Sequence, residues 1–563
     1  MTEFLFVFGL AIALAWPLGR YLATIMRGAP MRGERLFALV ERPIYRLLGV
    51  NPAQGMGLKT YAGAFLLSNL VLGLLVWLML MTQQWLPLNP NAAPNMRWDL
   101  ALHTAVSFLT NTNQQHYSGQ AQLSYLSQMS AIVGLQVITP MMGLALVVAT
   151  LRGLFGGRRQ VGRDEAVDVG NFWADLIRPT VRLFLPLCLL LSVLLTWQGV
   201  PATLDGGPLA KPLDGAAQMS EQKIPLGPVA AMVAAKQLGT NGGGWYGPNS
   251  AAPLENPTPL SNLLQTLAII LLPMSVVFMV GSLTGRAKLS ALIFGCMLSM
   301  SLMSAGIAMW SEGHSASSSD SALMEGKEVR FGADASALWA AVTTQTSNGS
   351  VNAMHDSLAP LTGMVAIANM LVNAIWGGVG CGLQQFLVYL LLSVFLAGLM
   401  TGRTPELLGR KIEASEVKCL AVLILLQPLV VLGFTALTLL LPDLAGTSSP
   451  GAHAISQVLY EYTSAFANNG SGFEGLGDAT YWWNLSCVVA LILGRYPALI
   501  LPLIIAALLA RKRVTPEGPG TLQIETPTFA LTLMAIIAIL TLLQFMPVLV
   551  LGPVADHLQF ITR

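Results

Sequence analysis

The stretch Thr240-Asn241-Gly242-Gly243-Gly244 decides the fold, because it is a polar, glycine-rich loop between two apolar runs that can cross a membrane. Its three glycines carry no side chains, so the backbone can turn freely and present its carbonyl groups. At membrane depth such a loop is tolerated only where it is buried in protein or lines a water-filled path. Rings of backbone carbonyls that replace an ion's hydration shell form cation selectivity filters. Taken alone, the loop also fits an external turn. Three further stretches of the same kind favour an ion filter over an external turn.

The composition is that of a protein that crosses the bilayer many times. The 563 residues have a mean hydropathy of +0.62, and 10% are charged, against about 25% in soluble domains. The five cysteines lie in or beside apolar runs, so we expect buried free thiols. The six histidines show no spacing typical of metal ligands, and the sequence predicts no metal site apart from that of a transported ion. Nothing in the sequence indicates a nucleic-acid partner.

Ten runs reach the roughly 20 apolar residues that cross a bilayer as a helix. They are residues 4–26, 62–81, 121–151, 180–200, 259–284, 288–310, 359–401, 418–441, 482–510 and 528–551. Basic clusters follow every other run, which places both chain termini outside the cell. The clusters are residues 20–59, 152–163, 286–288, 403–418 and 511–513. The first run lacks a basic segment before it, so we expect an uncleaved span and not a signal peptide.

The run 359–401 is nearly long enough for two spans, but two spans would move the basic cluster 403–418 outside. We therefore expect one broken helix, interrupted at residues 377–382, where four of six residues are glycine. Carbonyl groups freed by such a break must face protein or water. Gly377, Gly378 and Gly380 are thus candidates for a gate, and a packing bend between crowded helices is the alternative.

Four shorter, half-apolar pieces lie between alternate spans and are too short to cross the bilayer. They are residues 98–110, 227–239, 333–345 and 454–466, and each precedes a polar loop. The order span, short helix, loop, span therefore occurs four times. We predict an all-α polytopic membrane protein with ten transmembrane helices. Four pseudo-repeated helix–pore loop–helix units surround a central pore, with one extra helix at each end. The predicted divisions are 1–60 (N-terminal helix and basic loop), 61–165, 166–287, 288–417 and 418–515 (pore repeats 1 to 4) and 516–563 (C-terminal helix).

The four loops contain Asn, Gly, Ser and Thr but no acidic residue: residues 110–115, 240–244, 346–350 and 467–471. Neutral oxygen atoms suit a weakly hydrated monovalent cation, whereas a divalent cation prefers carboxylates as well. The C-terminal end of each short helix would add the negative end of its dipole. We expect K⁺ in preference to Na⁺.

Several longer stretches carry a family resemblance. LGTNGGGWYGPNSAAPLENPTPL (238–260), MEGKEVRFG (324–332), NGSVNAMHDS (348–357), TGRTPELLGRKIE (401–413) and YTSAFANNGSGFEGL (462–476) resemble the KdpA family, over essentially the whole chain. That family supplies the potassium-binding, channel-like subunit of the bacterial Kdp complex in the inner membrane. The resemblance implies that K⁺ enters from outside, is selected in the four-loop filter, and passes through an intersubunit tunnel to a separate P-type ATPase subunit.

The partners that the resemblance implies are the ATPase subunit KdpB and the small subunits KdpC and KdpF, besides the lipid bilayer. ATP is then used by the partner, and this chain is itself non-catalytic and binds no cofactor other than K⁺. The sequence agrees, since it contains neither the phosphorylation motif Asp-Lys-Thr-Gly-Thr nor a Gly-x4-Gly-Lys-Ser/Thr loop.

The predicted filter combines the positions that match the family with the other polar residues of the same loops. It consists of Thr110, Asn111, Thr112, Asn113 and Gln115; Thr240, Asn241, Gly242, Gly243 and Gly244; Ser347, Asn348 and Gly349; and Asn468, Asn469 and Gly470. The chain departs from many members at Gln114 and His116, which stand where those have Trp and Ser, and at Asn348, where others have Cys. Some members carry an acidic residue where Asn373 stands.

Arg495 lies inside the last span of the fourth repeat, where a charge costs a few kcal/mol by insertion scales. It could repel cations below the filter and send them sideways, or it could pair with a carbonyl at a helix break before Pro497. We expect His355 and Asp356 to cap a helix or line the outer vestibule. Lys236 and Glu461, in the short helices, are expected to face the rim.

Three rival functions fit parts of the pattern. A self-sufficient Trk/Ktr-type K⁺ channel or symporter would conduct without ATP. A carrier of inverted repeats does not explain four loops of the same orientation. A structural scaffold leaves the four polar loops without a role.

Overall fold

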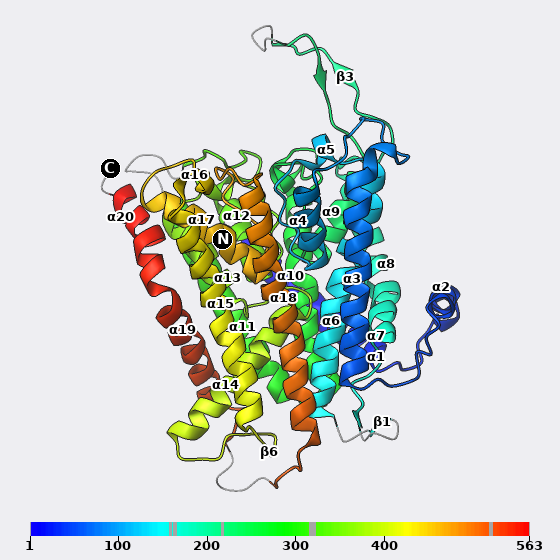
Figure 1. The fold of residues 1–563 in the computed structure, drawn as a ribbon, viewed down its shortest axis with the longest axis vertical. Helices are drawn as coiled ribbons and strands as arrows, with labels where there is room; N and C mark the ends of the chain where they lie inside the picture. Colours follow the sequence, from blue (N-terminus) through cyan, green and yellow to red (C-terminus); the bar gives the residue numbers. More distant parts are fainter. Residues whose placement is uncertain are drawn as a thin grey trace.

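The computed structural model describes residues 2–156, 160–161, 166–214, 219–314, 323–516 and 522–561. In these ranges ten helical segments are long and apolar enough to cross a membrane, as the sequence predicts. They stand side by side along the long axis of the molecule (Figure 1). The chain is therefore a multi-pass helical membrane protein. Parts of the predicted basic loop 152–163 lie outside the described residues.

Four units of the predicted kind follow one another, each with a short pore helix between longer ones. The first contains α3 (Leu58–Thr82), pore helix α4 (Trp98–Leu109), η2 (Ser127–Ile132) and α6 (Val133–Phe155). The second contains α7 (Phe172–Pro179), η3 (Thr180–Phe184), α8 (Leu185–Trp197), pore helix α9 (Val229–Leu238) and α10 (Pro259–Thr284). The third contains α11 (Ala287–Gly313), pore helix α12 (Gly332–Gln345), α13 (Pro360–Val372) and α14 (Cys381–Met400). The fourth contains α15 (Ala414–Leu439), pore helix α17 (Ala452–Ala467) and α18 (Tyr481–Arg511).

One extra membrane-spanning helix precedes these units and another follows them, as predicted. Helix α1 (Thr2–Met26) packs along α10, where Gly19 lies against the backbone at Ser275 with no room for a side chain. Helix α19 (Pro527–Leu549), which continues through η7 (Val550–Val554) into α20 (Ala555–Ile561), packs against the third and fourth units. Helix α1 begins and α20 ends in the half of the molecule that carries β3 (Figure 1).

The connections hold short elements that the sequence pattern did not predict. Three antiparallel hairpins pair β1 (Gln160–Val161) with β2 (Ala166–Val167), β3 (Leu209–Ala210) with β4 (Gln222–Lys223), and β5 (Glu406–Leu407) with β6 (Arg410–Lys411). The short helical turns are η1 (Gln83–Trp85), α5 (Gly119–Gln122), η5 (Asn249–Ala251), η6 (His355–Ser357) and α16 (Pro442–Ala445).

Helix α2 (Glu34–Leu47) corrects the expectation that residues 27–60 form only a basic loop. It lies to one side of the bundle (Figure 1) and exposes Leu36, Leu39 and Leu47. Arg182 of η3 holds it through a bidentate ion pair with Glu41, at 2.6 and 2.8 Å. Its arginines suggested a loop because charge interrupts the apolar run, whereas an amphipathic helix needs apolar residues on one face only.

The pore helices form the centre of the protein. Every described residue of α9 except Ala231 is buried, and α12 is buried from Ala335 onward. By contrast, α3 and α15 expose apolar side chains such as Leu70 and Leu425, as expected for helices that face lipid. The short helices are thus held by protein on all sides, which fixes the loops that follow them.

The stretch MEGKEVRFG fastens the outer ends of two pore loops. Lys327 forms a buried ion pair with Glu312, at 3.1 Å, and its backbone pairs with Ala353 beyond the third loop. Arg330 donates to the carbonyl oxygens of Ala251, at 2.7 Å, and Asn256, beyond the second loop. This family-typical stretch therefore has a structural role in positioning the loops.

Lys236 of α9 is fully buried and forms an ion pair with Glu255, so its predicted orientation toward the rim is wrong. Its Nζ also donates to Asn249, at 2.5 Å. Glu255 accepts from the backbone amides of Trp245, at 2.6 Å, and Tyr246, at 3.0 Å. The pair connects the second pore helix to the segment that leaves its loop.

We expect Lys236→Met to lower the free energy of unfolding by about 3–5 kcal/mol, because it leaves the buried carboxylate of Glu255 without its cation. The double variant Lys236→Met/Glu255→Gln should recover part of the loss. Thermal unfolding of the detergent-solubilised chain measures both. A single variant as stable as the parent would contradict the assignment.

Candidate functional site

The four polar loops have the same backbone conformation. Each has two residues with positive φ, separated by one residue, immediately after its pore helix. The pairs are Asn111 (64°) and Asn113 (57°), Thr240 (51°) and Gly242 (73°), Ser347 (51°) and Gly349 (82°), and Asn468 (54°) and Gly470 (98°). The repeat predicted from topology is therefore present in the backbone, although the sequences of the loops differ.

Neighbouring loops touch in cyclic order. A Cβ atom on Gly242 would overlap the carbonyl oxygen of Asn348 in the third loop. A Cβ on Gly349 would likewise overlap that of Asn469 in the fourth. One on Gly470 would overlap the carbonyl oxygen of Thr112 in the first. Glycine permits this close approach as well as the positive φ. The loops therefore surround one axis in the order of the chain.

Asparagine side chains tie the second, third and fourth loops back to the preceding repeat. Nδ2 of Asn348 donates to the carbonyl oxygen of Lys236 in α9, at 3.2 Å. Nδ2 of Asn469 donates to that of Thr343 in α12, at 2.9 Å. Nδ2 of Asn241 donates to Oδ1 of Asn111, at 2.7 Å. Three of the predicted filter residues thus use their side chains as struts, and Asn348 is one of them.

In each loop, the residue between the two positive-φ residues has a backbone carbonyl that is available to bind a ligand. Within the described residues, those of Thr112, Asn241, Asn348 and Asn469 accept no hydrogen bond. Each belongs to a different loop and occupies the equivalent place in it. A buried carbonyl without a hydrogen-bond partner calls for a ligand.

Other carbonyls of the second loop are already bound. Gly242 accepts from Asn249, at 2.6 Å, Gly243 from Gln136, at 3.1 Å, and Gly244 from Gln115, at 3.0 Å. Oε1 of Gln115 in turn accepts from the Gly244 amide, at 2.7 Å, so this side chain clamps the first loop to the second. Gln136 and Asn249 were not predicted, because a lone amide residue has no recognisable sequence signal.

The first loop breaks the four-fold pattern. Asn113 stands where the other loops have glycine, and within the described residues both polar atoms of its buried side chain have no hydrogen-bond partner. Asn111 is engaged instead, since its Oδ1 accepts from Thr139, at 2.8 Å, and its Nδ2 donates to Thr240, at 3.0 Å. Thr110 and Thr112 share a hydrogen bond of 2.8 Å between their hydroxyls.

The predicted helix break is confirmed: α13 ends at Val372 and α14 begins at Cys381. The segment between them docks on three pore loops. The amide of Gly378 donates to Thr346, at 2.5 Å, and that of Val379 to the Thr240 hydroxyl, at 3.1 Å. Asn373 accepts from Ser347, at 2.9 Å, and donates to the carbonyl of Ala467, at 3.3 Å. The backbone amides of the break therefore bond to the pore loops. Gly377, with its amide on Gln345 at 2.7 Å, and Gly380, against Gly143, lie in the same segment.

Arg495 of α18 is buried next to this segment. Its guanidinium donates to Sγ of Cys381, at 2.8 Å, and to the carbonyl of Thr139, at 3.4 Å. In the described part of the chain no carboxylate lies within ion-pair distance of it. The alternative interpretation is therefore met in part: Arg495 does pair with a carbonyl, but helix α18 continues through Pro497 without a break.

A cavity of about 550 Å³ opens on the loops. Asn113, Gly349 and Gly470 line it, together with His116 and Glu461. Glu461 lines this cavity as a buried side chain and not as a solvated charge. The cavity forms a vestibule over the loops.

His355 and Asp356 do not act on one another. Buried His355 bonds to the Tyr460 hydroxyl, at 2.8 Å, whereas Asp356 contacts His453 of α17, at 3.0 Å. His453 also contacts Asp556, at 2.8 Å. Hydrogen bonds to Asp356 and Asp556 raise the pKa of His453 to about 9. His355 and Asp356 therefore each contact a side chain of pore helix α17.

Comparison with known proteins identifies the family. The family model described as "Potassium-transporting ATPase A subunit" (KdpA) matches residues 5–558. The chain belongs to the KdpA family. Among curated relatives, proteins named "Potassium-transporting ATPase potassium-binding subunit" are 46% identical over 550 residues in Pseudomonas putida, with 96% of each chain covered. Those in Gloeobacter violaceus are 44% identical, covering 97% of this chain and 96% of the relative, and in Bacteroides fragilis 42%, covering 98% of each.

A solved structure shows the same fold at low sequence identity. The potassium transporter TrkH from Vibrio parahaemolyticus superposes with a TM-score of 0.51 at 15% identity, covering 88% of this chain and 98% of TrkH. A similar fold therefore occurs outside the KdpA family. At this sequence identity the similarity concerns the fold alone.

We expect Gly349→Ala to weaken K⁺ binding roughly tenfold or more. The added Cβ would meet the Asn469 carbonyl, and overpacking of this kind costs about 1–3 kcal/mol. Gly306→Ala is the matched control, because its Cβ would have no atom within 4 Å. Isothermal titration with K⁺ measures the affinity of both. Equal affinity in Gly349→Ala and the control would refute the close-packed ring.

Proposed function

We propose that this chain is the K⁺-selective binding and translocating subunit of an ATP-driven, high-affinity K⁺ import complex. The observation that carries the proposal is the ring of four loops with a carbonyl that accepts no hydrogen bond within the described residues at the equivalent position of each, at Thr112, Asn241, Asn348 and Asn469. The names of the relatives, which are potassium-binding subunits of potassium-transporting ATPases, support the choice of ion.

Selection of K⁺ follows from the chemistry of the ring. The loops contain no acidic residue, so a cation is held by dipoles only. Neutral carbonyls replace the weak hydration shell of K⁺ at little cost and release the ion again, as conduction requires. The negative ends of four helix dipoles, at the C-termini of α4, α9, α12 and α17, add to the attraction.

Routing depends on the segment between α13 and α14 and on Arg495. Gly377, Gly378 and Gly380 lie in a segment that is docked across the second, third and fourth loops. Arg495 adds a buried positive charge beside it, which opposes a straight descent of K⁺ to the cytoplasm. K⁺ then leaves sideways to a separate P-type ATPase subunit.

The division of labour assigns ATP hydrolysis to the partner KdpB and leaves this chain non-catalytic, with KdpC and KdpF completing the complex. The chain would lie in the bacterial inner membrane with both termini outside, because its basic clusters follow every other span. The charged loop 401–418, which carries the β5–β6 hairpin, is a docking surface for the ATPase subunit.

Purification of the tagged chain from its native host should bring down an ATPase that K⁺ stimulates. The alternative, a self-sufficient Trk/Ktr-type channel, predicts instead that the chain alone carries K⁺ flux in liposomes without ATP. Finding that flux, with no ATPase in the purified material, would replace the proposal by its rival.

Substitution Arg495→Ala should open a passive cation leak, because it removes the positive charge next to the α13–α14 segment. Arg495→Lys is the matched control, since it keeps the charge. We expect ATP-independent K⁺ efflux from proteoliposomes of the complex to rise severalfold in the alanine variant only. Unchanged efflux and uptake in Arg495→Ala would remove Arg495 from the routing of the ion.

A further inference from the structure

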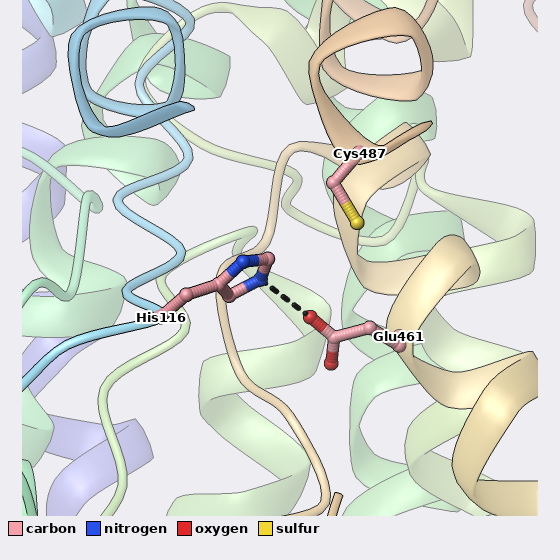
Figure 2. Close-up of side chains that lie close together, drawn as sticks. All are labelled: His116, Glu461 and Cys487. Atoms are coloured by element: carbon pink, nitrogen blue, oxygen red, sulfur yellow. Dashed lines mark hydrogen bonds and ion pairs between the residues drawn. The ribbon is translucent and has the colours of Figure 1, made fainter. Parts of the chain in front are cut away.

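Three side chains of the vestibule wall converge on one point. His116 follows the first pore loop, Glu461 belongs to pore helix α17, and Cys487 belongs to α18. Their ligand atoms all lie within 4.8 Å of one another, and all three residues are buried. Figure 2 shows the imidazole, carboxylate and thiol pointing toward a common space. The cluster joins the first repeat to the fourth, next to the ring of loops.

The spacing suits a tetrahedral metal ion. Nε2 of His116 lies 3.2 Å from Oε1 of Glu461 and 3.9 Å from Oδ2 of Asp478. Ligands at roughly 2.0–2.3 Å from a tetrahedral zinc ion lie about 3.3–3.7 Å from one another. Small side-chain movements therefore bring one nitrogen, two carboxylate oxygens and one sulfur into the coordination shell.

A second layer of hydrogen bonds presents His116 in the form that binds a metal. Nδ1 of His116 lies 2.7 Å from Oδ1 of Asn484. The amide nitrogen of Asn484 donates to Asp99, at 2.8 Å, so its oxygen must face the imidazole. Arg97 fixes Asp99 through contacts of 2.5 and 2.8 Å. Nδ1 therefore donates, and Nε2 is left to face Glu461 as the ligand atom.

A metal ion can reach the cluster from the cavity over the loops, and its binding would disturb the first loop. His116, Glu461 and Asp478 line the outer cavity together with Asn113 of the filter. Oε1 of Glu461 also accepts from Nε2 of Gln114, the residue after Asn113, and the carbonyl of Gln114 accepts from Ser107, at 2.9 Å. A metal that takes Oε1 competes with the hydrogen bond that holds this end of the first loop.

We propose that His116, Glu461, Cys487 and Asp478 form a binding site for a zinc-class divalent cation, and that its occupation slows K⁺ entry. Thiolate and imidazole ligands select Zn²⁺ or Cd²⁺ and have little affinity for K⁺, so the site does not belong to the transport path of K⁺. Binding displaces the thiol proton of Cys487 to water, and the Sγ–metal bond replaces the S–H bond. The Glu461–Gln114 hydrogen bond is lost, and the first loop loses a support.

The direct test is a titration of the purified complex with Cd²⁺, after chelation and buffer exchange. We expect one equivalent to bind with a thiolate-to-cadmium charge-transfer band in the ultraviolet. Cys487→Ser should abolish the band. Cys296→Ser is the matched control, because Cys296 is also buried but its thiol donates to the Ala530 carbonyl, at 3.9 Å, away from the cluster, and the band should persist. A band that survives Cys487→Ser, or no band in the parent, overturns the site.

Two further variants keep the test decisive if Cys487→Ser fails to fold. His116→Gln retains every cysteine but removes the nitrogen ligand, and Asn484→Ala removes only the group that orients it. We expect the apparent Cd²⁺ affinity to fall at least about tenfold in Asn484→Ala, as for other residues that orient a metal ligand, and further in His116→Gln, which lacks the ligand atom. Unchanged affinity in His116→Gln would overturn the proposal.

A measurement of K⁺ uptake distinguishes a failure of the proposed metal site from a failure of the proposed K⁺ transport function. Zn²⁺ should slow K⁺ uptake by the parent complex in proteoliposomes, and His116→Gln should be resistant. Metal binding without any K⁺ uptake would count against the proposed transport function and leave the metal site standing. Uptake that Zn²⁺ slows equally in parent and His116→Gln would overturn the proposed link to the filter.

Discussion

The structure depends on the close approach of the four pore loops. At Gly242, Gly349 and Gly470 the backbone of one loop touches a carbonyl of the next, and no side chain fits between them. Loops that approach one another this closely must be held in place by the surrounding protein, because the contacts between the loops themselves are polar. The buried pore helices, the asparagine struts and the two buried ion pairs of Lys236 and Lys327 supply that support.

Hydropathy and length predicted the frame of the molecule well. The four pore helices and most of the spans are found within a few residues of their predicted bounds, because an apolar run of given length has few alternatives in a bilayer. The fourth span begins earlier than predicted, at Phe172, and the last continues further, to Gln559. The break before Cys381 was predicted for a similar reason, since four glycines in six residues cannot sustain a helix. Helix α2 was missed because its apolar face is short and interrupted by arginine.

The contacts between repeats could not be predicted. Asn348 reads as a filter ligand in the sequence, but its side chain is a strut to Lys236, 112 residues earlier. Glu461 reads as a rim charge, and its partner His116 lies 345 residues away. The sequence around a residue does not show whether its charge is buried and paired or exposed to water. These roles therefore become visible only in the folded structure. The loop composition still pointed to the right segments, because left-handed backbone favours Gly and Asn.

The charges next to the loops are unequally compensated. Glu255 beside the second loop pairs with Lys236, and Glu461 beside the fourth pairs with His116 and accepts from Gln114, so these two carboxylates add little net field to the ring. Within the described residues, Arg495 has no carboxylate within ion-pair distance, and it lies beside the broken helix, against Cys381 and Thr139. Under the proposed function, a cation that leaves the carbonyls toward Arg495 meets rising potential. This charge would then disfavour conduction by the chain alone, as we expect of a subunit that passes its ion to a separate pump.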